Sequence, residues 1–185
     1  MIVKLKTTDE ILYDSVEVSG GFRNLIVPKL IPEIKRDLEN GKKPIFCPVL
    51  DGGMSIFREL VIHLKSFDSN LYDSCDLELI GCSSYDDNKG AKTNKFLIQV
   101  FKSLHLWVTN DSHIYLVDDI CDTGDTLKEL INMFKSVNEE ANITSVVLIN
   151  RATHKNKDIT PDIYAFDCPL EDFLIFEPTV YCSDI

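Results

Sequence analysis

Apolar residues repeat along the chain with two different spacings. Spacings of three and four residues, typical of one helix face, occur in Leu30-Ile31-Ile34-Leu38 and in Leu127-Leu130-Ile131-Phe134. The first of these helices is expected to end near Gly41, and another helix is expected to follow residue 53 through about residue 65. Apolar runs predict strands at residues 44–50, 77–84, 96–100, 114–117, 143–149, 162–166 and 173–176. Polar residues 86–94 are expected to form a loop.

Strands alternate with helices over most of the chain, which favours an α/β fold with a mainly parallel sheet flanked by helices. The chain has 185 residues and is expected to form one domain, residues 1–185, large enough to bury about two-thirds of its unfolded surface. We expect the core at about residues 26–160. The N-terminal segment and residues from about 161 to 185 are expected to form a small hood over the binding edge of the sheet.

The most informative segment runs from residue 114 to residue 126. An apolar run is followed by two adjacent acids, Asp118 and Asp119, then by Asp122 and the turn Thr123-Gly124-Asp125-Thr126, and then by a helix. Ligands of open α/β sheets bind at the carboxyl ends of strands. Free N–H groups at a helix N-terminus attract anions. The sequence therefore predicts a binding site at this junction.

The residue types in this junction suit two different parts of one ligand. The turn offers several N–H donors and two hydroxyls, which fit a single phosphate group, and Gly124 permits close approach of the backbone. Asp118 and Asp119 repel phosphate, but they suit hydroxyls, a Mg²⁺ ion or a centre that becomes positive during reaction. Phosphate beside a cis-diol describes a ribose 5-phosphate.

The segment resembles the 5-phosphoribosyl-1-pyrophosphate (PRPP) motif of type I phosphoribosyltransferases. Its alternative is an ordinary strand–turn–helix with acids in the loop. Neither a P-loop nor an EF-hand pattern is present. The resemblance implies a twisted parallel sheet with a hood, and PRPP binding by Asp118, Asp119, Asp122 and Thr123 to Thr126.

Two further segments extend the resemblance. Leu50-Asp51-Gly52-Gly53 resembles the family's pyrophosphate loop, although a simple glycine turn is the alternative. Purine enzymes usually carry Lys or Arg at the position of Asp51, so this acid is a departure from the family pattern. Ser84-Tyr85 resembles the Ser-Tyr pair of a mobile loop that closes over PRPP and excludes water from a reactive intermediate.

The end of the chain resembles the base site of the 6-oxopurine enzymes, which act on guanine, xanthine or hypoxanthine. The resemblance places Arg151 at the cationic position that binds the 6-oxygen of the purine, where the family usually has Lys. It places Phe173 against the ring and the backbone of Leu174 near the 2-substituent, and it assigns Asp122 to proton exchange with N7. Arg151 as a surface charge, Phe173 as a core residue and Asp122 as a helix cap remain alternatives.

Composition sets the outer limits of function. The chain is 44% hydrophobic and 26% charged, with a net charge of −11, which argues against a nucleic-acid-binding surface. No segment reads as a signal peptide or a membrane span, so a cytoplasmic protein is expected. The 6 cysteines lack zinc-type spacing and are expected to be reduced thiols.

Taken together, the resemblance implies transfer of 5-phosphoribosyl from PRPP to N9 of a 6-oxopurine in purine salvage, with release of pyrophosphate. Asp118, Asp119 and Asp122 would be the catalytic acids. Mg²⁺ would be held mainly through PRPP and water, near Asp118 and Asp119. The resemblance also implies a homo-oligomer, a dimer or a tetramer, without nucleic-acid or membrane partners. A non-catalytic PRPP-binding regulator and an enzyme for another base are the rival functions.

Overall fold

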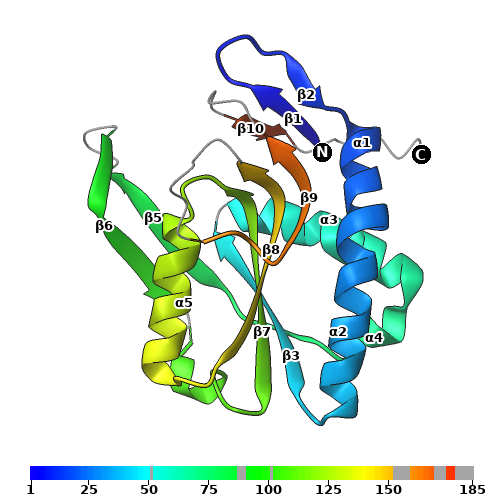
Figure 1. Cartoon of the computed structure of the whole chain (residues 1–185), viewed down its shortest axis with the longest axis vertical. Helices are drawn as coiled ribbons and strands as arrows, with labels where there is room; N and C mark the ends of the chain where they lie inside the picture. The colour runs from blue at the N-terminus through cyan, green and yellow to red at the C-terminus, as the bar shows by residue number, and fades with distance from the viewer. Residues whose placement is uncertain (51, 87–90, 101, 152–158, 169–173, 178–185) are drawn as a thin grey trace, which may run out of the picture.

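The structure is a computed structural model, drawn in Figure 1. It describes residues 1–50, 52–86, 91–100, 102–151, 159–168 and 174–177, with the backbone alone for residues 83–86 and 91–97. Within this part of the chain, no helix is long and apolar enough to cross a membrane.

A 7-stranded sheet forms the centre of the molecule, with the order β6-β5-β3-β7-β8-β9 and with β4 paired to β3. Its parallel strands are β3 (Lys43–Leu50), β7 (Ser112–Cys121), β8 (Asn142–Arg151) and β9 (Ile163–Cys168), joined by β4 (Asp76–Leu77) and β5 (Ile80–Asp86). Only β6 (Ala91–Val100) is antiparallel among these described strands. The predicted mainly parallel sheet is therefore confirmed.

Helices cover both faces of this sheet. One face carries α1 (Ser15–Gly21), the π-helix η1 (Phe22–Ile26), α2 (Val27–Glu39), α3 (Gly52–Phe67) and α4 (Ser69–Asp73). The other face carries α5 (Asp125–Val137) and the short 3₁₀ helix η2 (Leu104–Leu106). Figure 1 shows α5 on one side of the sheet and α1 with α2 on the other.

Two hydrophobic cores lie on opposite faces of the same strands. Tyr115 and Val117 of β7 belong to the core beneath α2 and α3. Ile114 and Leu116, the alternate residues, belong to the core beneath α5. Because side chains alternate along a strand, a strand buried on both faces must be apolar at successive positions. This explains the unbroken apolar run that predicted the strand.

A second, 3-stranded antiparallel sheet has the order β10-β1-β2 and joins the two ends of the described chain. It consists of β1 (Ile2–Leu5), β2 (Ile11–Tyr13) and β10 (Leu174–Glu177). In Figure 1 this sheet lies at the end of the molecule toward which β8 and β9 point. It occupies the place where a hood over the binding edge is expected.

Two expected boundaries of the hood differ in the structure. The tail from about residue 161 does not lie wholly in the hood, because β9 pairs with β8 in the central sheet. Ile163 and Cys168 of β9 are buried there. The boundary expected near residue 25, between the N-terminal part of the hood and the core, is also absent. There α1, η1 and α2 follow one another without a break from Ser15 to Glu39.

The polar segment around residue 90 is the main error of secondary structure. The predicted loop at residues 86–94 is wrong, because Asp86 ends β5 and residues 91–94 open β6 in an antiparallel hairpin. Antiparallel pairing satisfies backbone donors and acceptors whatever the side chains, so polar composition does not prevent a strand. The strand predicted at residues 77–84 is interrupted between Leu77 and Ile80, although both pieces pair with β3.

Candidate active site

The carboxyl ends of β7 and β8 bring the expected proton-transfer acid and the expected base-binding cation together. Cys121 of β7 is aligned with Asn150 of β8, so the residues that follow them, Asp122 and Arg151, are neighbours. Arg151 Nε lies 3.3 Å from Asp122 Oδ1, and the Arg151 side chain is only 7% exposed. The alternative of Arg151 as a surface charge is wrong, and its positive charge faces the acid.

Two adjacent acids, the buried Asp118 and the half-buried Asp119, lie near the end of β7. The backbone N–H of Asp119 donates to Asp118 Oδ1 at 2.9 Å, and the N–H of Ile120 donates to Asp119 Oδ1 at 2.7 Å. Burial raises the pKa of Asp118, and the charge of Asp119 raises it further. Burial also raises the pKa of Asp119. The pair therefore favours a positive or hydroxyl-bearing ligand that would compensate its charge.

The glycine pair after β3 packs directly against this part of β7. A Cβ atom on Gly52 would lie 2.6 Å from Asp119 Cγ, and one on Gly53 would overlap the carbonyl oxygen of Val117. The only described glycines with positive φ are Gly41 and Gly124, so the pair is not required by unusual backbone angles. It is required by close approach. Asp51, the expected departure in this loop, lies outside the described residues.

The expected phosphate turn lies at the start of α5. Gly124 adopts φ +89° and is the N-cap residue, a left-handed conformation that favours glycine. The hydroxyl of Thr123 donates to Asp125 Oδ2 at 2.6 Å, and the N–H of Asp125 donates to Thr123 Oγ1 at 3.3 Å. The N-cap position of α5 belongs to Gly124 and not to Asp122. Apart from adjacency, no sequence pattern predicts the contact between Thr123 and Asp125.

The remaining expected site residues are described to different extents. Ser84 and Tyr85 lie in β5, with the backbone of Tyr85 paired to Lys92 across the hairpin, and their side chains are not described. Leu50 ends β3 and is half-buried. Leu174 begins β10, is buried, and pairs with Leu5 in the second sheet. Phe173 lies outside the described residues, so its expected role against the base stays a prediction.

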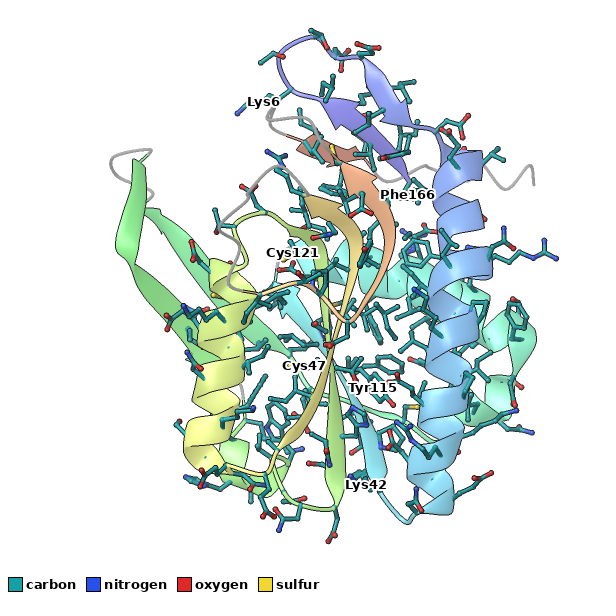
Figure 2. The ribbon with its side chains drawn as sticks, in the orientation of Figure 1. Lys6, Lys42, Cys47, Tyr115, Cys121 and Phe166 are labelled. Carbon is teal, nitrogen blue, oxygen red and sulfur yellow. The ribbon has the colours of Figure 1, made fainter. Side chains whose placement is uncertain are left out.

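Contacts between the two sheets were not foreseen from the sequence. The ring of Tyr13 on β2 stacks on Phe166 of β9, with centroids 4.3 Å apart. Figure 2 shows Phe166 between β9 and the helix formed by α1 and η1. Nearby, the Asn150 amide donates to Asp167 Oδ1 at 2.8 Å. These contacts join residues far apart in the chain, and no periodicity marks them.

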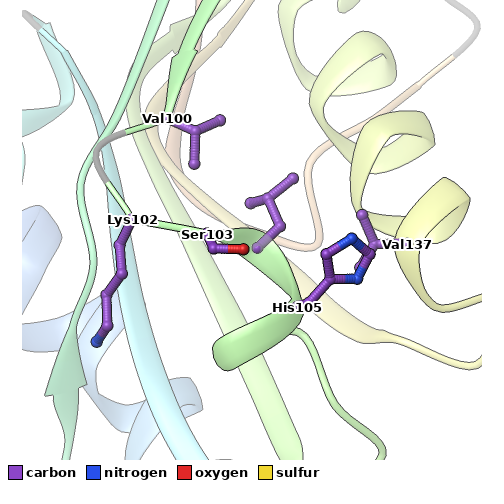
Figure 3. Close-up of a pocket in the computed structure, with 6 residues that line it drawn as sticks. Val100, Lys102, Ser103, His105 and Val137 are labelled. Atoms are coloured by element: carbon purple, nitrogen blue, oxygen red, sulfur yellow. The ribbon is translucent and has the colours of Figure 1, made fainter.

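A hollow of about 340 Å³ lies between the end of β6 and the C-terminal end of α5 (Figure 3). It is lined by residues that include Lys102, His105 and Val137. Val137 ends α5, whose first residue, Asp125, belongs to the phosphate turn. A helix of 13 residues is about 20 Å long, so the hollow is remote from the acids. We do not assign it to the site.

Comparison with known proteins gives the family of the chain. The family model described as "Phosphoribosyl transferase domain" matches residues 23–181, which include the acids, the phosphate turn and Arg151. The chain belongs to the phosphoribosyltransferase family. The expected family is thereby confirmed.

Relatives and solved structures agree with this assignment. This phosphoribosyltransferase is 30% identical over 146 residues to the hypoxanthine-guanine phosphoribosyltransferase of Streptococcus pneumoniae, covering 77% of this chain and 72% of the relative. It is 26% identical to that of the dog, Canis lupus familiaris, over 65% of this chain and 54% of the relative. A hypoxanthine phosphoribosyltransferase structure from Staphylococcus aureus, 20% identical, superposes with a TM-score of 0.63 over 90% of this chain and 79% of that one. The structural likeness establishes the shared fold.

Proposed function

We propose that this phosphoribosyltransferase transfers the 5-phosphoribosyl group of PRPP to N9 of a 6-oxopurine base and releases pyrophosphate, as a step of purine salvage. The proposal is supported by the names of its relatives, which include hypoxanthine-guanine phosphoribosyltransferases. It is also supported by the acids and the phosphate turn that meet at the end of β7.

The contact between Arg151 and Asp122 is the observation that carries the proposed base specificity. Guanine presents N7 and O6 as neighbouring acceptors on one edge, whereas adenine presents N7 beside an amino donor. In our proposal Arg151 donates to O6, while Asp122 exchanges a proton with N7. Two groups 3.3 Å apart suit two neighbouring atoms of one ring edge. An adenine amino group would instead face the guanidinium, donor against donor.

The other groups of the site have complementary roles in this proposal. Asp118 and Asp119 bind the ribose hydroxyls and stabilise the positive charge that develops at C1′ as the bond to pyrophosphate breaks. The hydroxyls and N–H groups of Thr123 to Thr126 bind the 5′-phosphate at the positive end of α5. As N9 attacks C1′, the base loses its N7 proton to the Asp122 carboxylate.

Magnesium fits this site only in company with the substrate. Among the described residues, no group of three or more His, Cys, Asp or Glu side chains is arranged to hold a metal ion. Mg²⁺ keeps several waters and is commonly bound through one or two carboxylates plus phosphate oxygens. We therefore propose that Asp118 and Asp119 contact it mainly through water and PRPP. When bound, Mg²⁺ would neutralise charge on the leaving pyrophosphate.

The proposed reaction is tested by measuring pyrophosphate release from PRPP and Mg²⁺ with six bases: guanine, xanthine, hypoxanthine, adenine, uracil and orotate. We expect a 6-oxopurine to be preferred over adenine by about a thousandfold or more in kcat/KM, because mismatched polar groups in a closed site are costly. Higher activity with adenine, uracil or orotate would contradict the base assignment. PRPP binding without turnover of any base would favour the non-catalytic regulator.

The base assignment is sharpened by replacing the cation. Gln offers both a donor and an acceptor, so Arg151→Gln is expected to reduce the preference for 6-oxopurines over adenine. Arg36→Gln, a change at an exposed position of α2, is the matched control and should leave the preference unchanged. Equal preferences in the two variants would show that Arg151 does not contact the base.

A cytoplasmic, homo-oligomeric enzyme is part of the same proposal, and light scattering of the purified protein measures its oligomeric state.

A further inference from the structure

We propose that Gly52 is a positioning residue for Asp119, so that one glycine of the pyrophosphate loop serves the ribose-binding acid. This inference rests on the proposed function, in which Asp119 binds a ribose hydroxyl. It differs from the role expected for the loop, which is to present N–H groups to pyrophosphate.

The contact itself is the evidence. All three atoms of the Asp119 carboxyl group lie within 2.9 Å of the place where a Gly52 side chain would begin. Real Cβ atoms essentially never approach other atoms under 3.0 Å, so any side chain at this position must displace the carboxylate. The three nearest atoms all belong to the Asp119 side chain. The glycine therefore makes room for a functional group.

The carboxylate has little freedom to move away. Its Oδ1 atom accepts a hydrogen bond from the N–H of Ile120 at 2.7 Å. The neighbouring acid, Asp118, is buried and itself accepts from the Asp119 N–H. The carboxylate is thus bounded by the β7 backbone on one side and by the start of α3 on the other. Displacing it would break the hydrogen bond and change where its second oxygen points.

Gly53 shows that the two glycines have separate roles. A Cβ atom there would overlap the Val117 carbonyl oxygen, which is backbone at the centre of the sheet. Replacing Gly53 would push α3 away from β7, which is a change of the fold. Replacing Gly52 would move one carboxylate. The two positions are adjacent in sequence, yet only Gly52 is expected to act on ligand binding through Asp119.

The two possible roles of Gly52 predict different ligand dependence. A nucleoside 5′-monophosphate has ribose hydroxyls but no pyrophosphate, so it reports on Asp119 without involving the anion of the loop. Pyrophosphate alone reports on the loop. If Gly52 positions Asp119, Gly52→Ala should weaken binding of guanosine 5′-monophosphate by tenfold or more, which is about the contribution of a hydrogen bond to a charged group. Binding of 2′,3′-dideoxyguanosine 5′-monophosphate, which lacks both hydroxyls, should change by less than about twofold, since only solvated-charge effects remain.

Calorimetric titration of the three ligands against wild type, Gly52→Ala and Gly20→Ala makes the test. Gly20 is the matched control, because a Cβ atom there meets only Asn24 Nδ2 at an ordinary 3.8 Å. Weaker binding of pyrophosphate alone, with unchanged guanosine 5′-monophosphate affinity, would overturn the proposal and return Gly52 to an anion-binding role. Equal losses for the nucleotide and its dideoxy analogue would also overturn it.

Thermal unfolding tests the contact without any ligand, so it remains decisive even if the proposed reaction is wrong. Gly52→Ala should lower the Tm of the wild type but not of Asp119→Ala, because the atoms that clash are then gone. In Asp119→Asn, whose side chain has the same size, the loss should persist. If wild type binds no purine nucleotide, the proposed function fails while this pattern still establishes the contact. Equal losses of Tm in all three backgrounds would overturn the positioning role.

Discussion

Strand β7 has buried carboxylates near both of its ends, and their surroundings differ. At its start, Asp37 of α2 is 3% exposed and lies 2.7 Å from His113 Nδ1. The hydroxyl of Tyr115 donates to Asp37 at 2.6 Å, and His113 Nε2 lies 2.9 Å from Thr144 Oγ1. At the end of the strand, Asp118 is 8% exposed, and its nearest groups are a backbone N–H and a second acid.

The difference separates a structural acid from acids held ready for a ligand. Oδ2 of Asp37 contacts two side chains, His113 through Nδ1 and Tyr115 through its hydroxyl. Burial and the hydrogen bond to Asp37 raise the pKa of Tyr115. Burial raises the pKa of both Asp118 and Asp119, and for Asp118 the charge of Asp119 raises it further. Groups that a fold leaves uncompensated are commonly found at functional sites. Replacing the two kinds of acid should therefore change stability in opposite directions.

The largest effect is expected from removing both charges at the end of β7. Asp118→Asn with Asp119→Asn should lower kcat by about 10⁴-fold, because each contact to a developing charge is typically worth about 3 kcal/mol. Steady-state pyrophosphate release measures the loss, and circular dichroism checks that the fold is kept. Asp111→Asn, an exposed acid before β7, is the control and should retain wild-type turnover. Unchanged kcat in the double variant would show that Asp118 and Asp119 take no more part in the reaction than a structural acid such as Asp37 does.

At the other end of β7 the same chemical change should act on stability. Asp37→Asn leaves His113 and Tyr115 facing a neutral amide in a buried position. We expect the free energy of unfolding to fall by about 3 kcal/mol, because hydrogen bonds to a buried carboxylate are replaced by weaker ones to a neutral amide. Urea denaturation measures this change, while kcat at low temperature should stay near that of the wild type. A large loss of kcat in fully folded Asp37→Asn would show that this network also serves the reaction.

The expected pH dependence sharpens the comparison further. Burial raises the pKa of Asp118 in the folded protein above its unfolded value of about 4. The folded state then binds more protons than the unfolded state between these two values, so stability falls as pH rises through that window. Below the unfolded pKa this loss is absent, and above the folded pKa it is complete.

Asp118→Asn removes the titrating group, so the ligand-free variant should be more stable than wild type at pH 7–8. The gain in Tm is expected to be several degrees, since 1 kcal/mol corresponds to about 2–4 °C for a chain of this size. The difference between variant and wild type should shrink toward zero near pH 4. Differential scanning calorimetry over pH 4–8 measures it. A variant less stable than wild type at pH 8 would mean that protein groups compensate the charge of Asp118, as they do for Asp37.

The central sheet, and the strand–turn–helix order around the candidate site, could be predicted because local sequence determines them. The apolar run of β7, the acids after it and the helical spacing of α5 lie in one continuous segment. Parallel strands place their carboxyl ends at one edge of a sheet. The resemblance to the 6-oxopurine enzymes, and not this geometry, gave Arg151 its expected place at the base site. The adjacency of Asp122 and Arg151 is a consequence of the register between β7 and β8.

Features that depend on packing between distant segments could not be predicted in the same way. The strands predicted at residues 77–84 and 96–100 were too short, because the antiparallel pairing of β5 with β6 continues through polar residues without an apolar pattern. The space that Gly52 leaves for Asp119 depends on how closely α3 approaches β7. Two adjacent glycines in a sequence do not reveal whether they serve an unusual backbone angle, a bound anion or a tight contact. The structure excludes the first of these, since neither Gly52 nor Gly53 has a positive φ, and it shows the tight contacts of both residues.

The smallest expected effect concerns an exposed acid inside the phosphate turn. Asp125 accepts the hydroxyl hydrogen of Thr123, so the turn carries a carboxylate at the helix end where a phosphate should bind. Unlike Asp118, this acid is exposed and its charge is screened by water. Asp125→Asn would remove a repulsion from the ligand and release the Thr123 hydroxyl. It would also remove a favourable charge at the N-terminus of α5.

We therefore expect Asp125→Asn to strengthen PRPP binding by no more than about fivefold, as for other solvated charges, and to lower Tm slightly. Calorimetric titration of PRPP with Mg²⁺ measures the affinity, and Glu129→Gln, an exposed acid one turn further along α5, is the matched control. If Asp125 instead orients Thr123 toward the phosphate, the variant should bind PRPP more weakly, and Thr123→Val should weaken binding by the same factor. That result would show that Asp125 contributes to PRPP binding by orienting Thr123.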